Sequence, residues 1–493
     1  MINISHPSAR PVRCTIVAVV TAVVAVFSAG SYDVSRADVV AFFNSEHIVT
    51  VPLSFRYRPE YWKAFTPGSD SFHGLRARVG VNYRYKQGFR LLAEVQGTGV
   101  FGLSNPSTGA GAVDLGNNGG ETDPASLRPN QLFAQFGPVP GTWVRLGRSY
   151  IDGGSVIRYD EGNWQYLKQK RLGQRLLGSV GFSNSARAND GIASRVAAGD
   201  HVLHLYAAQP TTGVFVVDDE AYRPNRDIQY AGLDWTAPRG TLLESGELSA
   251  FALGYSDHRD PAQVAGLFGD IEVFTFGGSW LHVRALGQGN LDLALWAALQ
   301  FGDYVDAGPA SGVRERDQRA GALVAEAGYQ RPDLWGAPWF RFGVNWASGD
   351  ADLDDDDRET FFNVLPTNHL YYGAADQLAF QNLLDVFLQL KLKTPDKLGI
   401  DLIWHRFRLD QAADFRWAGT GAFSRANLGY ARSGSNDSDD DDVGHELDLT
   451  LSYPLPRGMS LSAAYSRFWG GDVFSGREND NLDFAYVQFA WKH

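Results

Sequence analysis

Cationic side chains recur at alternate positions in this chain, and a row of guanidinium and ammonium groups can bind carboxylates. The first row is Arg76, Arg78, Arg84 and Lys86, all at even positions of the segment LRARVGVNYRYK. Arginine suits a carboxylate because its planar fork forms two parallel, charge-assisted hydrogen bonds and stays ionised. Later segments contain further candidates on their polar positions, namely Arg90, Arg145, Arg341, Lys391 and Lys393. Such a row would let an anionic polymer slide past weak, repeated sites.

The element that would position the first row is a β-strand with one apolar and one polar face. From Leu75 to Tyr85 every odd position is apolar or aromatic, while the even positions are polar or glycine. This period of two is typical of a strand with two unlike faces. An outer-membrane barrel needs strands of about ten residues, with lipid outside, water inside and aromatic girdles. We therefore expect the cations to line a lumen. Arg148 is out of phase with Arg145, so a bulge or strand end would have to re-aim one of them.

The same alternation continues to the end of the chain. It recurs in residues 290–304, 338–350, 383–395, 445–456 and 485–493, with short turns at 138–142 and 394–397 and long polar loops elsewhere. The final strand carries Val487, Phe489, Trp491 and His493 on one face, a pattern that the barrel assembly machinery reads. The predicted fold is all-β, a single transmembrane antiparallel β-barrel with long extracellular loops and short periplasmic turns. The length of the mature chain suits 16 to 18 strands, on the order of 11 residues each.

The N-terminal segment predicts export from the cytoplasm. Arg10 and Arg13 precede an uncharged run over residues 15–29, as in a secretory signal peptide. We expect residues 1–37 to be this signal, cleaved after Ala37 or near Gly30, and residues 38–493 to form the barrel. The mean hydropathy is −0.23, and no later segment is apolar enough for a spanning helix. The expected location is the outer membrane of a Gram-negative cell, with membrane lipid and lipopolysaccharide as neighbours and no nucleic-acid partner.

The net charge of −12 does not exclude an anion path, because the location of charge matters more than its sum. Two acidic runs lie between strands: Asp352 with Asp354–Asp357 and Glu359, and Asp437 with Asp439–Asp442. Neither has the spacing of an EF-hand. We expect solvated loops facing the outer leaflet, with calcium binding as the alternative.

Several residues have a structural interpretation beside the functional one. The lumen cations could pair with carboxylates and only brace the barrel, the candidate partners being Glu94, Asp292, Asp385, Glu446 and Asp448. His369 could touch a substrate or form a hydrogen bond within its loop. His282, His405 and His445 lack metal-ligand spacing. The chain has no nucleophile elbow, phosphate-binding glycine loop or zinc-protease motif, so we expect neither enzymatic activity nor a cofactor or metal.

Four motifs in order resemble those of the alginate export family of outer-membrane proteins. They are the R-x-R strand at Arg76, the RLGR strand from Arg145, the P-x-x-H-x-Y-x-G-x-x-D stretch from Pro366 and the G-x-E-x-D strand from Gly444. The region that carries them spans residues 56–493. The resemblance implies an 18-stranded monomeric barrel whose basic lumen passes a polyuronate. It also adds Arg158, which matches the arginine that follows RLGR in the family.

Three functions remain open at this point. The first is a passive outer-membrane channel for an anionic polysaccharide, an alginate-like polyuronate or a related oligomer. The second is a porin for small anions such as organic acids. The third is a plugged surface scaffold or adhesin whose acidic loops matter more than its lumen.

Overall fold

The computed structural model describes residues 41–493 apart from 45, 66–67, 155, 218–226, 263–266, 420–439 and 475–480. Of residues 41–44 it describes the backbone alone. The predicted signal peptide, residues 1–37, lies outside the described residues. Within them, no helix is long and apolar enough to cross a membrane.

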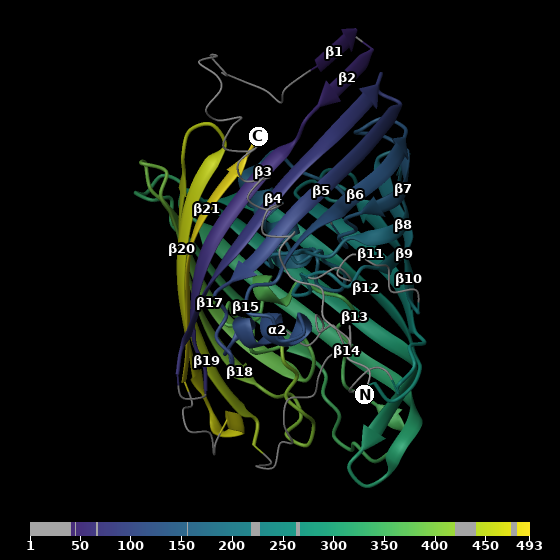
Figure 1. Cartoon of the computed structure of the whole chain (residues 1–493), viewed down its shortest axis with the longest axis vertical. Helices are drawn as coiled ribbons and strands as arrows, with labels where there is room; N and C mark the ends of the chain where they lie inside the picture. Colours follow the sequence, from purple (N-terminus) through teal and green to yellow (C-terminus); the bar gives the residue numbers. More distant parts are fainter. Residues whose placement is uncertain are drawn as a thin grey trace, which may run out of the picture.

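Eighteen strands form a closed antiparallel barrel (Figure 1). Each strand pairs with the next one along the chain, and β21 closes the barrel by pairing with β3. The number agrees with the predicted 16 to 18. The barrel strands are β3 (Leu53–Lys63), β4 (Asp70–Tyr85), β5 (Phe89–Phe101), β6 (Ala125–Phe136), β7 (Trp143–Ser149), β8 (Asn189–Ala198), β9 (His201–Pro210), β10 (Ile228–Ala237), β11 (Gly246–Asp257), β12 (Ile271–Leu286), β13 (Gly289–Gly308), β14 (Gly312–Gln330), β15 (Trp339–Ala347), β17 (Leu383–Lys393), β18 (Gly399–Arg408), β19 (Asp442–Pro454), β20 (Met459–Gly470) and β21 (Asn481–Lys492).

Most short turns and the C-terminus share one end of the barrel, and the long loops lie at the other, together with the short connection 309–311 between β13 and β14. The short connections include 86–88, 137–142, 287–288 and 394–398, which confirms the turns predicted near residues 138 and 394. In outer-membrane barrels the short turns face the periplasm. At this turn end, β1 (Ala41–Asn44) and β2 (His47–Thr50) extend the sheet beyond the start of β3. Figure 1 shows them at the top of the view, the end of the barrel at which the C-terminus also lies.

The strand register places the apolar side chains of β4 on the outer surface. Val79 and Val81 are 39% and 51% exposed there, although both are aliphatic. A solvated surface would make such exposure unfavourable, whereas lipid accommodates it. The alternation of side chains then directs Arg76, Arg78 and Asn82 inwards, as the sequence predicts.

A charge on that outer face should hinder folding. We expect Val79→Arg to cost about 2–4 kcal/mol of barrel stability near the membrane midplane, because the guanidinium would face lipid. Urea unfolding in phospholipid vesicles measures the cost, with Val79→Leu as the apolar control. A Val79→Arg variant as stable as the control would contradict the register.

Two long loops fold into the lumen. The β7–β8 loop, residues 150–188, carries α3 (Gly162–Leu167) and the π-helical turn η1 (Lys168–Leu172). The β15–β17 loop, residues 348–382, carries β16 (Asp357–Arg358) and the short helix η2 (Asn368–Leu370). Outside these loops lie α2 (Ala110–Asn117) in the β5–β6 loop and η4 (Asp472–Phe474) after β20.

The two inward loops pack against each other as one unit. A parallel bridge joins Leu177 to Leu365, and the Gly178 N–H donates to the Leu365 carbonyl at 2.8 Å. Phe361 and Val364 are fully buried in a hydrophobic core between the loops and the barrel wall. Tight apolar packing of this kind leaves little empty space. The loops therefore fill much of the lumen and set where a passage can run.

Candidate functional site

A cavity of about 1130 Å³ occupies the part of the lumen that the inward loops leave open. Pro52, Gly458 and His493 line it at the turn end of the barrel. Gln174 and Thr367 line it on the side of the two inward loops. Its barrel wall comes from β18–β21 and β3–β6, strands that the closure of the barrel brings together. Strands from the N-terminal part and from the C-terminal part of the sequence therefore form the wall of the cavity together.

One wall of the cavity is basic. Arg56, Arg76, Arg78 and Arg90 line it from the adjacent strands β3, β4 and β5. They face inwards because they occupy the polar positions of strands whose odd-numbered neighbours face lipid. Glu94 also lines this wall, but it accepts hydrogen bonds from Gln131 and Asn130.

Three of these arginines are hydrogen-bonded to neutral groups. Arg78 donates to Gln96 at 2.6 Å and to the Tyr150 hydroxyl at 2.8 Å. Arg90 donates to Asn82 at 2.7 Å, and its guanidinium lies over the Phe133 ring. Arg56 donates to main-chain carbonyls of the β7–β8 loop. None of these hydrogen-bond partners is a carboxylate, so this wall is able to attract and bind anions.

The β7–β8 loop adds three more cations to the cavity lining, and one of them, Arg171, is paired with Glu326. Arg158 and Lys170 both line the cavity. Burial lowers the pKa of Lys170, and the Asp152 carboxylate opposes that effect. The same π-helical turn carries Lys168, whose side chain points away from the cavity and pairs with Glu247 on β11. One short turn therefore anchors the loop and presents a cation to the lumen.

Other predicted cations brace the structure. Arg341 is 2% exposed and pairs with Asp292 and Glu326, the latter at 2.6 Å. Lys391 pairs with Asp401 at 2.5 Å. For these two the bracing interpretation fits the contacts, because each positive charge is matched by a carboxylate. Arg145 points inwards but lies away from the cavity, bonded to Gln135 and stacked on Phe133.

The Glu326 cluster (Arg171, Arg175, Asp292, Glu326 and Arg341) ties the β7–β8 loop to the barrel wall. Arg171 and Arg175 reach Glu326 at 2.8 and 3.2 Å, and the Glu326 side chain is fully buried. Burial alone would lower the pKa of Arg171, but the Glu326 carboxylate outweighs it and raises that pKa.

Four further predicted cations do not line the cavity. Arg148 is opposite the exposed Leu132 and pairs with Asp190 at 2.7 Å, so it lies on the outer face. No bulge re-aims it, because the register of β6 and β7 is regular there. Lys86 lies in the β4–β5 turn with Glu46, while Arg84 and Lys393 are exposed at the turn end.

The two late motifs meet inside the barrel. Glu446 and Asp448 accept hydrogen bonds from the N–H groups of Ala375 and Ala374, at 2.8 and 3.2 Å. Gly373 has a φ of +86°, and a Cβ there would lie 2.4 Å from a Glu446 oxygen. The motif glycine and the motif carboxylates therefore hold the β15–β17 loop in the lumen.

We expect Gly373→Ala to destabilise the protein by more than about 1 kcal/mol, since the methyl group adds a clash to left-handed backbone strain. Gly119→Ala is the matched control, because Gly119 has a φ of +68° and open space around its missing Cβ. Thermal unfolding in detergent, followed by circular dichroism, compares the two. Equal losses would show that Glu446 tolerates the methyl group.

His369 forms a hydrogen bond within its loop, from Nδ1 to Asp376 at 2.8 Å. It also stacks on Phe182 of the β7–β8 loop, with 3.5 Å between ring centroids. Since it lines the cavity as well, the structure is compatible with both expected roles.

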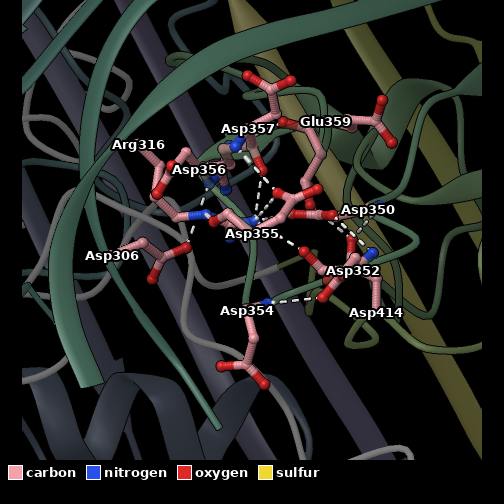
Figure 2. A network of polar contacts seen from close by, with 12 residues as sticks. Asp306, Arg316, Asp350, Asp352, Asp354, Asp355, Asp356, Asp357, Glu359 and Asp414 are labelled. Atoms are coloured by element: carbon pink, nitrogen blue, oxygen red, sulfur yellow. Dashed lines mark hydrogen bonds and ion pairs between the residues drawn. The ribbon is translucent and has the colours of Figure 1, made fainter. Parts of the chain in front are cut away.

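The first acidic run wraps around arginines rather than standing free in solvent (Figure 2). Arg316 of β14 is 1% exposed and reaches Asp350 at 2.8 Å and Asp355 at 3.3 Å. Burial raises the pKa of Asp414 to about 6, although Thr360 donates a hydrogen bond to it. Asp356, in contrast, is 92% exposed, although it pairs with Arg314 at 3.1 Å. The expectation of a solvated loop therefore holds only in part.

The second acidic run is described only from Asp440 onwards, and Asp437 and Asp439 lie outside the described residues. There, Asp441 pairs with Arg408 and Asp442 with Arg406. Within the described part of the chain, no group of three or more potential ligands could hold a metal ion.

Sequence reasoning missed Arg56 and Arg58. They alternate with Phe55 and Tyr57 in the segment SFRYRPEYWK, so the period of two could have found them. It also missed Lys170, Arg171 and Arg175, which lie in a loop without periodicity. No local signal marks the direction of such side chains.

Comparison with known proteins identifies the family. The family model for alginate export matches residues 48–488, nearly all of the barrel. The chain belongs to the alginate export family. Members of this family are outer-membrane proteins, so the chain is an outer-membrane channel with a transport role. A comparison with curated proteins finds no match.

Solved structures show the same fold at low sequence identity. OccAB1 of Acinetobacter baumannii is 12% identical with a TM-score of 0.56, covering 90% of this chain and 96% of that one. OccK9 (OpdG) of Pseudomonas aeruginosa is 13% identical with a TM-score of 0.55, over 90% and 98%. OccK2 (OpdF) of the same organism is 11% identical with a TM-score of 0.55, over 90% and 97%. These likenesses concern the fold.

Proposed function

We propose that this alginate export family channel passes carboxylate-bearing saccharides by passive diffusion, with an alginate-like polyuronate as its substrate. The observation that carries the proposal is the basic wall, where Arg56, Arg78 and Arg90 have neutral hydrogen-bond partners. Their charge is available to a passing carboxylate. The paired cations Arg341 and Lys391 do not contribute in this way.

The spacing of the wall suits a polymer that carries one carboxylate per sugar. Arg76 and Arg78 are two residues apart on β4, roughly 6 to 7 Å along the strand. Arg90 follows on β5, directly opposite Arg84. A chain of carboxylates could exchange from one guanidinium to the next, because each single contact is weak enough to break.

A second candidate is a porin for small carboxylates, and the inward loops favour it. They fill much of the lumen, which suits a monomeric solute better than a polymer. The structure of OccK2 (OpdF) contains glucuronate and that of OpdK contains vanillate, and both compounds are carboxylates. The two candidates share the basic wall and differ in the length of the substrate.

Current through single channels in planar bilayers tests the proposal. We expect oligogalacturonate to block the current at lower concentration than glucuronate, and a neutral malto-oligosaccharide of equal length not to block it. Block by glucuronate alone would favour the small-carboxylate porin. Absence of any current would favour the scaffold.

A further inference from the structure

The tip of the β7–β8 loop (residues 181–184) is held by arginines of the basic wall. Arg56 donates to the carbonyls of Gly181 at 3.0 Å and Ser183 at 2.7 Å. Arg76 donates to the same two carbonyls at 3.1 and 3.0 Å. Arg58 donates to the carbonyl between them, that of Phe182, at 2.7 Å. Three guanidinium groups thus hold three consecutive main-chain oxygens.

The hydrogen-bond partners of Arg56 do not match its charge. The Arg56 side chain is buried, and its partners are the two carbonyls and the Asn184 side chain, all neutral. Its Nε has no hydrogen-bond partner among the described residues. The charges that act on it are mostly positive, because Arg76, Arg58 and Arg78 outnumber Glu60. That carboxylate already pairs with Arg58 at 2.6 Å.

Arg56 is thus a buried guanidinium with one unused N–H and no carboxylate partner in the described part of the chain. A carboxylate is the ligand that such a group binds most strongly. Hydrogen bonds between two ionised groups are roughly twice as strong as those between neutral groups, and a carboxylate accepts a fork of two. Main-chain carbonyls are weaker acceptors of the same donors. The tip is also within reach of a solute, since Gly181 and Phe182 line the cavity together with Arg56 and Arg76.

We propose that Arg56 and Arg76 form a carboxylate-binding site that the carbonyls of the loop tip occupy in this structure, so that a uronate carboxylate displaces the tip. The inference rests on the proposed function and adds its regulation. A ligand shifts such an equilibrium only by its difference in affinity for the two states. A carboxylate would bind the two arginines only when the tip has been displaced, so it favours that state. A neutral sugar hydroxyl does not compete with the carbonyls in this way. The channel would then open its passage to charged saccharides and keep it narrow otherwise.

Release of the tip would break a defined set of contacts. Phe182 lies between the Arg58 guanidinium, 3.8 Å from its ring centroid, and the His369 imidazole. His369 belongs to the other inward loop, so movement of the tip would loosen the junction between the two loops. The displaced Phe182 and its main-chain amides provide a readout that does not depend on current.

Asn184→Asp tests the site with an isosteric change. The Asn184 oxygen accepts from Arg56 Nη2 at 2.9 Å, so the variant places a carboxylate of the chain in the site. This fixed competitor should weaken the block. We expect the oligogalacturonate concentration that blocks half of the current (half-block) to rise by about tenfold. Gln288→Glu, at the exposed β12–β13 turn, adds the same charge away from the site and should leave half-block unchanged. If Asn184→Asp and the wild type need the same oligogalacturonate concentration for half-block, the inference is wrong.

Hydrogen exchange of the wild-type protein in detergent tests the displacement directly. We expect oligogalacturonate, but not a malto-oligosaccharide, to speed amide exchange in residues 181–184 several-fold. If oligogalacturonate blocks the current while these amides exchange no faster, the inference is wrong and the proposed function stands. If oligogalacturonate does not block the wild-type channel, the proposed function fails and the inference fails with it.

Discussion

Replacing Arg78 and Arg90 together by glutamate is expected to turn the channel from anion-selective to cation-selective. Both side chains line the cavity, and the hydrogen-bond partners of both are neutral, so neither charge is matched by a carboxylate in direct contact. The double substitution changes the local charge by four units in a confined aqueous path. Lumen charges set selectivity in barrels of this kind. The reversal potential in a salt gradient across a planar bilayer should therefore change sign.

The matched control makes the same charge change at the rim of the barrel. Lys86→Glu with Lys393→Glu alters two exposed cations at the turn end, where water and salt screen them. We expect this pair to shift the reversal potential only slightly. Equal shifts in the two double variants would mean that the cavity is not the ion path.

Glu326→Gln is expected to destabilise the protein by about 3–5 kcal/mol, the usual cost of removing one partner from a buried ion pair. The substitution keeps the shape of the side chain but leaves Arg171, Arg175 and Arg341 facing a neutral amide. Since Arg171 and Arg175 belong to the β7–β8 loop, the loop also loses its attachment to β14. Single-channel current should consequently become larger and noisier.

Asp333→Asn is the control for this second experiment. Asp333 pairs with Arg331 at 2.8 Å in the exposed β14–β15 turn, where an ion pair contributes little. We expect no measurable change in thermal unfolding or in current noise. A Glu326→Gln variant as stable and as quiet as this control would show that the Glu326 cluster does not hold the loop.

The sequence alone determined the barrel and the direction of its strand side chains. Alternation with a period of two is a local property, because successive side chains in a strand point to opposite faces. It therefore identified β4, β13, β15, β17, β19 and β21 and directed Arg76, Arg78 and Arg90 inwards. The same rule applied strictly would have placed Arg148 outside, since it is three residues from Arg145. The motifs in turn led to the family.

Only the tertiary structure decided which inward cations have carboxylate partners. Arg341 and Arg78 look alike in sequence, yet Arg341 meets Asp292 and Glu326 while Arg78 meets Gln96 and Tyr150. These partners come from other strands and from an inward loop, so their positions depend on barrel closure and on loop packing. A loop has no period that would direct its side chains, and its path follows from the apolar core it buries. For this reason the arginine-held loop tip was beyond prediction, although the alternation of β3 could have directed Arg56 inwards.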